Sequence, residues 1–235
     1  MRDVRAILLD IEGTVTPISF VHEVLFPYAR EHVDSYLRQN LDLPEIQNDV
    51  AKLREEQATD SHVLQQPPIT SIETAVTYVN RLIDLDRKSP ALKSLQGKIW
   101  KAGYQDGSLK SPVYQDVLQA FERWRAAQIR INIFSSGSVL AQRLLFAHTE
   151  AGDLTDYIDQ YFDTAVGKKI DAQSYRAITS KLDLDPNEIL FVSDVLSELE
   201  AADTAGMQTR LCIRPGNPPQ PESELEVITS FDELP

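Results

Sequence analysis

The chain has 235 residues, 42% of them hydrophobic, with a formal net charge of −13 and an isoelectric point near 4.7. This length can bury a sizeable core in one large domain or two smaller ones, and the acidic balance argues against binding to nucleic acid or to an anionic membrane. The single cysteine, Cys212, excludes an intrachain disulfide and a cysteine-based zinc cluster.

The first predicted element is a short buried strand over residues 4–9. It ends in Asp10, Glu12 and Gly13, so two carboxylates lie at the carboxyl end of a strand, the edge where open α/β sheets bind ligands. Two acids at that edge suit nucleophilic attack with proton transfer, or a hard metal ion with oxygen ligands. Taken alone, they also fit an ordinary strand exit with solvated acids.

Residues 18–111 carry helical patterns and almost no strand signal. Helices are predicted from an apolar stripe starting at Val24, from Pro44 in a first turn, from a capping box at 70–73 and from a start at Ser89-Pro90. A helical insertion after the first strand predicts a cap domain over the ligand-binding edge. We therefore expect a core domain over residues 1–17 and 112–235 and a helical cap over 18–111.

From residue 113 onward, helices and strands alternate. Alternation with short links predicts an α/β fold, in which a Rossmann-like parallel sheet has helices on both faces. The first strand belongs to the same sheet. The predicted helices cover 113–124, 139–147, 175–182 and 197–205, and the strands cover 129–134, 161–162, 188–192 and 209–213.

Serine and lysine residues follow two of these strands. Ser135, Ser136 and Ser138 lie at a strand-to-helix turn, where hydroxyls and free N–H groups can cradle an anion, or where Ser138 can simply cap the next helix. Lys168 and Lys169 precede another helix and suit either a bound phosphate or a solvated surface.

A further apolar strand ends in an acid, Asp194, and Glu198 follows four residues later. Two strand ends bearing carboxylates, a serine turn and a lysine in one sheet predict a site for a divalent metal and a phosphate. Mg²⁺ prefers carboxylate, carbonyl, water and phosphate oxygens, while lysine and serine can stabilise charge on a transferring phosphoryl group.

The order of these residues is similar to that of a known superfamily. Asp10-x-Glu12-Gly-Thr14, then Ser135, Lys169 and Asp194, resembles the four motifs of the haloacid dehalogenase phosphohydrolases. Glu12 stands where the general motif has Asp, as in one branch, the acireductone synthases or enolase-phosphatases of methionine salvage. The segments that resemble this branch cover nearly the whole chain: DIEGTVTPISFVHEVLFPYA, WKAGYQDG, FSSGSVLAQRLLF, FDTAVGKK, LFVSDV and RPGNPP.

The resemblance implies a role for each site residue and implies Mg²⁺ as the cofactor. Asp10 is the expected nucleophile and forms an aspartyl-phosphate. The other roles are general acid and base (Glu12), Mg²⁺ ligands (Asp10, Asp194 and the Glu12 carbonyl), phosphate binding (Ser135, Ser136 and the catalytic Lys169), and support of the ligands without metal contact (Glu198).

The substrate implied by the resemblance is a methylthio diketopentyl phosphate, which is enolised and then dephosphorylated to acireductone. The alternatives are a simple phosphomonoesterase of the same superfamily, a metal-free dehalogenase, which needs no acid at position 12, and a phospho-receiver domain, which is much shorter and lacks a helical insertion. The expected partner is this small phosphorylated molecule, and we expect a monomer.

The cap is expected to contribute residues to the substrate pocket, although the sequence does not identify the base for enolisation. Trp100 continues an apolar helical stripe, which favours a core position over a place in the pocket. The N-terminus lacks the pattern of a signal peptide, and no apolar stretch approaches the ~20 residues that span a bilayer. We therefore expect a cytoplasmic protein. The residues that we expect from the cap in the substrate pocket are His22, Glu23, Arg30, Trp100, Tyr104 and Tyr114.

Overall fold

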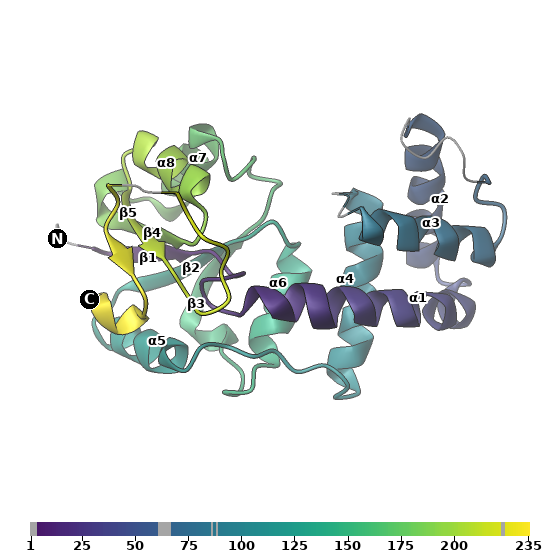
Figure 1. Ribbon diagram of the computed structural model, residues 1–235, viewed down its shortest axis with the longest axis horizontal. Helices are drawn as coiled ribbons and strands as arrows, with labels where there is room; N and C mark the ends of the chain where they lie inside the picture. The colour runs from purple at the N-terminus through teal and green to yellow at the C-terminus, as the bar shows by residue number, and fades with distance from the viewer. Residues whose placement is uncertain (1–3, 61–66, 86, 88, 222–223) are drawn as a thin grey trace. The chain divides into compact units, whose positions relative to one another are not determined.

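The structure is a computed structural model that describes residues 4–60, 67–85, 87, 89–221 and 224–235 (Figure 1). It divides into two compact units, one made of Met1–Val21 and Lys110–Pro235 and the other of His22–Leu109. The sequence placed the divisions after residues 17 and 111, a few residues away. Each unit has a hydrophobic core of its own.

The first unit is built on a parallel sheet in the order β3-β2-β1-β4-β5-β6. The predicted α/β fold class is therefore confirmed. The central strand β1 is only four residues long and completely buried, which explains its purely apolar sequence. The strands are β1 (Ala6–Leu9), β2 (Arg130–Phe134), β3 (Ile158–Phe162), β4 (Ile189–Ser193), β5 (Gln208–Cys212) and β6 (Val227–Ile228).

Helices cover both faces of this sheet, and Figure 1 shows α5 on one side and α7 and α8 on the other. Successive side chains of a strand point to opposite faces, so Ile7 and Leu9 of β1 pack in the core that contains Trp124 of α5, whereas Leu8 packs in the core that contains Tyr175 of α7. The helices are α5 (Asp116–Ala126), α6 (Val139–Ala147), α7 (Ala172–Leu182) and α8 (Leu196–Thr204), with 3₁₀ turns at Thr155–Tyr157, Pro186–Glu188 and Phe231–Glu233.

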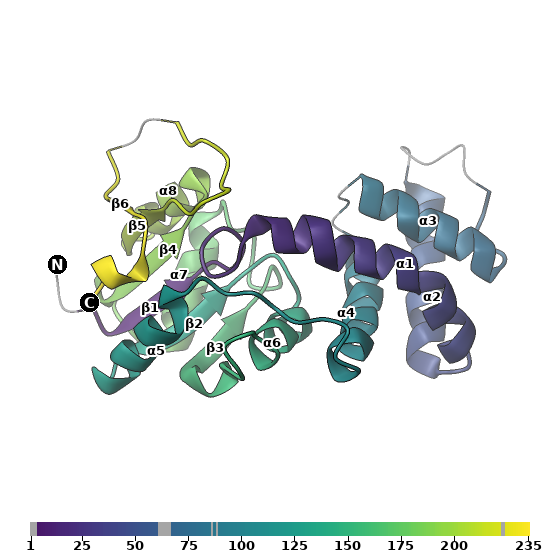
Figure 2. The same ribbon diagram turned by 60° about the horizontal axis from the view of Figure 1, so that its bottom comes forward.

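The second unit is helical over its described residues (Figure 2). Helix α1 packs against α3 and α4, and α2 packs against α4. Their shared core includes Leu37, Leu53, Tyr78 and Leu95, all at most 1% exposed. The helices are α1 (Phe26–Asn40), α2 (Pro44–Thr59), α3 (Ile72–Asp84) and α4 (Pro90–Gln105), and the π-helix Phe20–Leu25 precedes them.

The capping box predicted at 70–73 is displaced by one residue. Ser71 is the N-cap of α3, and its hydroxyl accepts from the N–H of Thr74, whose own hydroxyl accepts from the N–H of Ser71 at 3.0 Å. Threonine therefore replaces the expected Glu73 as the reciprocal partner, because Ser71 rather than Thr70 caps the helix.

None of the described helices is both long and apolar enough to cross a membrane.

Candidate active site

The carboxyl ends of three adjacent strands bring the predicted polar residues together. Leu9 at the end of β1 is in register with Ile133 of β2 and Val192 of β4. The residues that follow these strands, among them Asp10 and Asp194, therefore leave the sheet at the same edge. The backbone N–H of Asp10 still donates to the carbonyl of Val192 at 3.0 Å, which fixes the first turn beyond the strand.

Lys169 joins two of the predicted carboxylates. Its Nζ lies 2.5 Å from Oδ1 of Asp10 and 2.6 Å from Oε2 of Glu198. Ser193 adds a hydroxyl 3.1 Å from the same Glu198 oxygen and 3.5 Å from Oδ2 of Asp10. All four residues are buried, whereas Lys168 is exposed. The structure thus separates the two lysines in burial, with the motif residue Lys169 as the buried one.

The loop before α7 explains how Lys169 reaches the sheet edge. Gly167 has φ +138°, and a Cβ there would lie 2.2 Å from Oγ of Ser174, so a side chain would disturb the turn. Asp171 caps α7 by accepting from the N–H of Gln173 at 2.9 Å. The carbonyl of Lys169 accepts from the Tyr175 hydroxyl at 2.7 Å, which anchors the lysine backbone.

The buried charges at this edge do not balance. Burial, and then the charges of Asp10 and Glu198, raise the pKa of Asp194 to about 7. Burial and the charge of Asp10 likewise raise the pKa of Glu198 to about 7. Burial alone would lower the pKa of Lys169, but the two neighbouring carboxylates outweigh it and the net shift is upward. Three acids facing one lysine favour a further cation.

The donor set fits a hard divalent cation. Within the described ranges, no three His, Cys, Asp or Glu side chains are arranged to hold a metal ion by themselves. The ligands expected from the sequence, Asp10 and Asp194 with the backbone carbonyl of Glu12, include only two such side chains and are compatible with this finding. Mg²⁺ is commonly bound by one or two carboxylates and keeps several waters, so these residues suit it.

The loop after Asp10 approaches Asp194 closely. Gly13 has φ +73°, and a Cβ built on it would lie 2.4 Å from Oδ2 of Asp194. Only glycine combines this backbone conformation with such a close approach. Glu12, the residue before it, is half-buried. The glycine of the motif is therefore explained by its close approach to Asp194, the residue that follows β4.

The serine turn after β2 provides the N-cap of the next helix. Ser138 caps α6 by accepting from the N–H of Ala141 at 3.3 Å, which confirms the N-cap interpretation. Ser135 is 4% exposed, and its hydroxyl accepts from the N–H of Gly137 at 3.1 Å. Ser136 is half-buried beside it. Phosphate binding by Ser135 and Ser136 stays a prediction.

Two pocket candidates of the helical unit, Trp100 and Arg30, have polar contacts within that unit. Trp100 is buried, and its Nε1 donates to the carbonyl of Leu25 at 2.8 Å. Arg30 is paired with Asp84 on α3. The placement of Tyr114 in the cap is wrong, because this residue belongs to the first unit and stacks on the guanidinium of Arg214. His22, Glu23 and Tyr104 lie in the helical unit, as expected.

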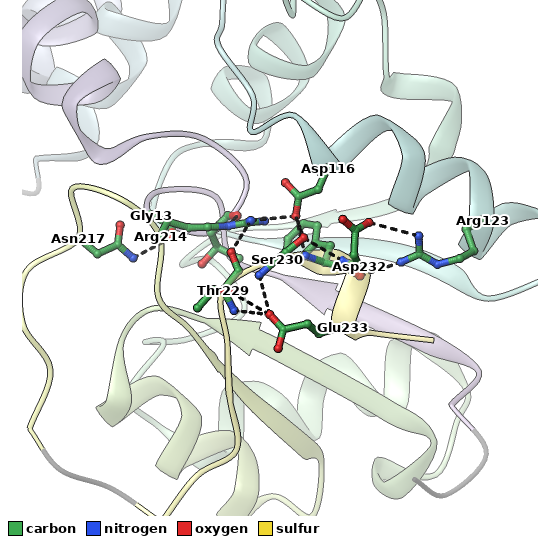
Figure 3. A network of polar contacts seen from close by, with 11 residues as sticks. Gly13, Asp116, Arg123, Arg214, Asn217, Thr229, Ser230, Asp232 and Glu233 are labelled. Carbon is green, nitrogen blue, oxygen red and sulfur yellow. Dashed lines mark hydrogen bonds and ion pairs between the residues drawn. The ribbon is translucent and has the colours of Figure 1, made fainter.

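Sequence reasoning missed a polar network around Arg214 and Asn217, which Figure 3 shows. These two residues contact the loop after Asp10. Their signal was the segment RPGNPP, which contributed to the resemblance but received no role from it.

Comparison with known proteins identifies the family. Residues 4–206 match the family model of the haloacid dehalogenase-like hydrolases. The chain is 51% identical to "Enolase-phosphatase E1" of Synechococcus elongatus over 98% of both chains, and 44% identical to the protein of that name from Drosophila melanogaster, covering 99% of this chain and 93% of that one. The chain belongs to the enolase-phosphatase E1 family of haloacid dehalogenase-like hydrolases.

A solved structure matches the fold of this chain. The crystal structure of the UTR4 protein from Saccharomyces cerevisiae matches with a TM-score of 0.82 and 38% identity, covering 99% of this chain and all of that one. The family named from the sequence motifs and the interpretation as a hydrolase are therefore confirmed. The receiver-domain alternative loses its support, since the match to the hydrolases spans most of the chain.

Proposed function

We propose that this chain is an enolase-phosphatase, which converts the methylthio diketopentyl phosphate of methionine salvage to acireductone and inorganic phosphate. The observation that carries the proposal is the full-length identity of 51% to a protein named enolase-phosphatase E1. The contact of Asp10 with Lys169 beside Asp194 supports it, because this arrangement suits phosphoryl transfer at the expected motif positions.

In the phosphatase step, Asp10 attacks phosphorus. A bond forms between a carboxylate oxygen of Asp10 and phosphorus, the ester bond breaks, and Glu12 gives a proton to the leaving oxygen. Water then loses its proton to Glu12 and attacks the aspartyl-phosphate, which releases phosphate and restores Asp10. Lys169 orients the Asp10 carboxylate, and Lys169, Ser135 and Ser136 stabilise the transferring phosphoryl oxygens.

We assign Mg²⁺ as the cofactor, held by Asp10, Asp194 and the carbonyl of Glu12. When bound, it screens the repulsion between the anionic nucleophile and the anionic substrate, and it can stabilise an enolate. Glu198 supports this group through Lys169 and Ser193 without contacting the metal. We further propose that the chain acts as a cytoplasmic monomer on this small substrate.

Mg²⁺ is expected to be required for turnover and to bind without substrate. Saturation at 100 times the dissociation constant would raise the free energy of unfolding by about 2.7 kcal/mol, measured by thermal or chemical unfolding.

Because the proposed ligand Asp194 has a pKa raised to about 7, Mg²⁺ affinity should increase as pH rises toward that value. Ca²⁺, with its looser and higher coordination, should bind but inhibit. Full turnover in excess chelator would contradict the assignment.

The substrate assignment is tested with the diketone phosphate and a panel of simple phosphate esters, both with Mg²⁺. Phosphate release and the absorbance of a conjugated enol are followed together. We expect the enol to form before phosphate appears, and only with the diketone. Release of phosphate from many simple esters without enolisation of the diketone would instead establish the plain phosphomonoesterase.

A further inference from the structure

The turn that follows β5 contacts the loop that follows β1. Arg214 is 5% exposed, and its Nε donates to the carbonyl of Thr14 at 3.2 Å. Asn217 lies three residues later, and its Nδ2 donates to the carbonyl of Gly13 at 2.9 Å. Figure 3 shows Asn217 directed at Gly13 from this turn. Two consecutive carbonyls of the loop after Asp10 thus accept hydrogen bonds from two side chains of a single turn.

Arg214 is itself held rigidly, so its contact with Thr14 has a fixed direction. Its Nη1 lies 2.8 Å from Oδ2 of Asp116 and donates to the carbonyl of Thr229 at 2.9 Å. Its guanidinium carbon lies 4.6 Å from the ring centres of both Tyr114 and Phe231. An ion pair and two stacked rings leave this buried side chain little freedom.

Asp116 completes this support. It accepts from the N–H of Phe231 at 2.5 Å and from the hydroxyl of Ser230 at 3.1 Å. Burial acts to raise its pKa, but these hydrogen bonds and the charge of Arg214 outweigh burial and hold the pKa below its usual range. Asp116 therefore stays ionised and keeps Arg214 in place at neutral pH.

The loop after Asp10 needs outside donors. Its own N–H groups are satisfied internally, since those of Thr14, Val15 and Thr16 donate to the carbonyl of Ile11 and that of Gly13 donates to Thr16. The carbonyls of Gly13 and Thr14 point the other way, toward Asn217 and Arg214. Buried carbonyls require such partners, so the turn determines how the peptide groups on either side of Thr14 are oriented.

Asn217 also limits the position of Gly13. A Cβ on Gly13 would lie 2.4 Å from Oδ2 of Asp194 and 3.0 Å from Oδ1 of Asn217. The Gly13 backbone is therefore enclosed between a proposed metal ligand and the amide that holds its carbonyl. A small rotation of the Glu12–Gly13 peptide group would move the Glu12 carbonyl. The position of this carbonyl relative to Asp194 would then change.

We propose that Arg214 and Asn217 are positioning residues, which hold the Gly13 and Thr14 carbonyls and thereby fix the Glu12 carbonyl and Asp194 as a pair of metal ligands. This inference rests on the proposed function for its catalytic consequence, but its effect on Mg²⁺ binding does not depend on the substrate. Neither residue touches substrate in this assignment.

Asn217 provides the sharper test, because removing Arg214 would leave Asp116 buried without its partner and could prevent folding. Asn217→Ala removes the donor, and Asn217→Asp keeps the shape while replacing the donor with an acceptor. Gln208→Ala is the matched control, since Nε2 of Gln208 donates to the carbonyl of Asn187 at 2.7 Å near the other end of the strands.

Mg²⁺ affinity is measured by calorimetry on the substrate-free protein, together with the melting temperature, kcat and KM. Both Asn217 variants should bind Mg²⁺ about 10- to 100-fold more weakly, the range found when a supporting hydrogen bond of a metal ligand is lost. Their kcat at fixed subsaturating Mg²⁺ should fall similarly, with little change in KM. Gln208→Ala should keep the wild-type Mg²⁺ affinity.

Two results would overturn the inference. One is wild-type Mg²⁺ affinity and kcat in Asn217→Asp, which would show that the donor has no role. The other is a lower melting temperature in both Asn217 variants with unchanged Mg²⁺ affinity, which would make the contact merely structural. If the wild-type protein releases no phosphate, the proposed function fails, while the Mg²⁺ titrations still decide the role of Asn217.

Discussion

Asp10→Asn is expected to abolish phosphate release while leaving part of the enolisation activity. In the proposed mechanism, phosphoryl transfer requires the Asp10 carboxylate as nucleophile, whereas enolisation removes a proton next to a carbonyl and requires a base with stabilisation of the enolate. An amide at position 10 cannot form the aspartyl-phosphate, but its oxygen can still serve as a metal ligand. The phosphorylated enol should therefore accumulate, and its conjugated absorbance would make it visible.

The amide also removes one negative charge from a crowded group. Lys169 contacts both Asp10 and Glu198 in the native protein, so Asp10→Asn leaves it paired with Glu198. We therefore expect the variant to fold, which thermal unfolding would verify. Loss of activity would then reflect chemistry and not a disrupted core.

Asp194→Ala is the matched comparison for Asp10→Asn. It removes a proposed metal ligand and should stop both enolisation and phosphate release. Substrate-free Mg²⁺ titration separates the two variants, because Asp10→Asn should retain measurable binding and Asp194→Ala should lose it. If Asp10→Asn binds Mg²⁺ yet forms no enol, then Asp10 also serves the first step and the two half-reactions cannot be separated in this way.

The sequence predicted the elements of the α/β unit best where their apolar pattern is continuous, as in strands that are buried on both faces. The predicted strand at 188–192 corresponds to β4 (Ile189–Ser193), whose residues are all buried, and the predicted helix at 139–147 matches α6. In β3, only 161–162 was predicted, although the strand starts at Ile158. Its middle residues, Asp159 and Gln160, are polar and not buried, so an apolar pattern could not reveal this strand.

The candidate site was predictable to the extent that function depends on strand ends. A parallel sheet gathers the residues after β1, β2 and β4 at one edge, so Asp10 and Asp194 could be grouped from sequence alone. Residue type and spacing alone could not choose between Lys168 and Lys169, because which lysine reaches the sheet edge depends on the turn at Gly167. The choice of Lys169 came from the motif resemblance. Arg214 was missed because its partner Thr14 is 200 residues away in the sequence, and no local pattern records such a contact.

The second large effect is expected at Lys169. Lys169→Met removes the cation 2.5 Å from the proposed nucleophile and should lower kcat by on the order of 10²–10³, comparable to the loss of one charge-stabilising donor in other enzymes. Lys168→Met is the matched control, since it makes the same chemical change at the preceding residue. Lys168 is exposed, and such surface substitutions change the free energy of unfolding by only about 0.5 kcal/mol or less.

Lys169→Met also leaves Asp10 and Glu198 buried without their shared partner, so its effect on folding must be separated from its effect on catalysis. Breaking a buried pair commonly costs about 3–5 kcal/mol, and the melting temperature of the variant should fall. Because the remaining acids repel each other, Mg²⁺ should recover part of this stability without recovering kcat, since the metal cannot replace a donor to the phosphoryl oxygens. Equal and mild losses of kcat in both lysine variants would show that Lys169 acts only as a buried counterion and that phosphate is bound by other groups.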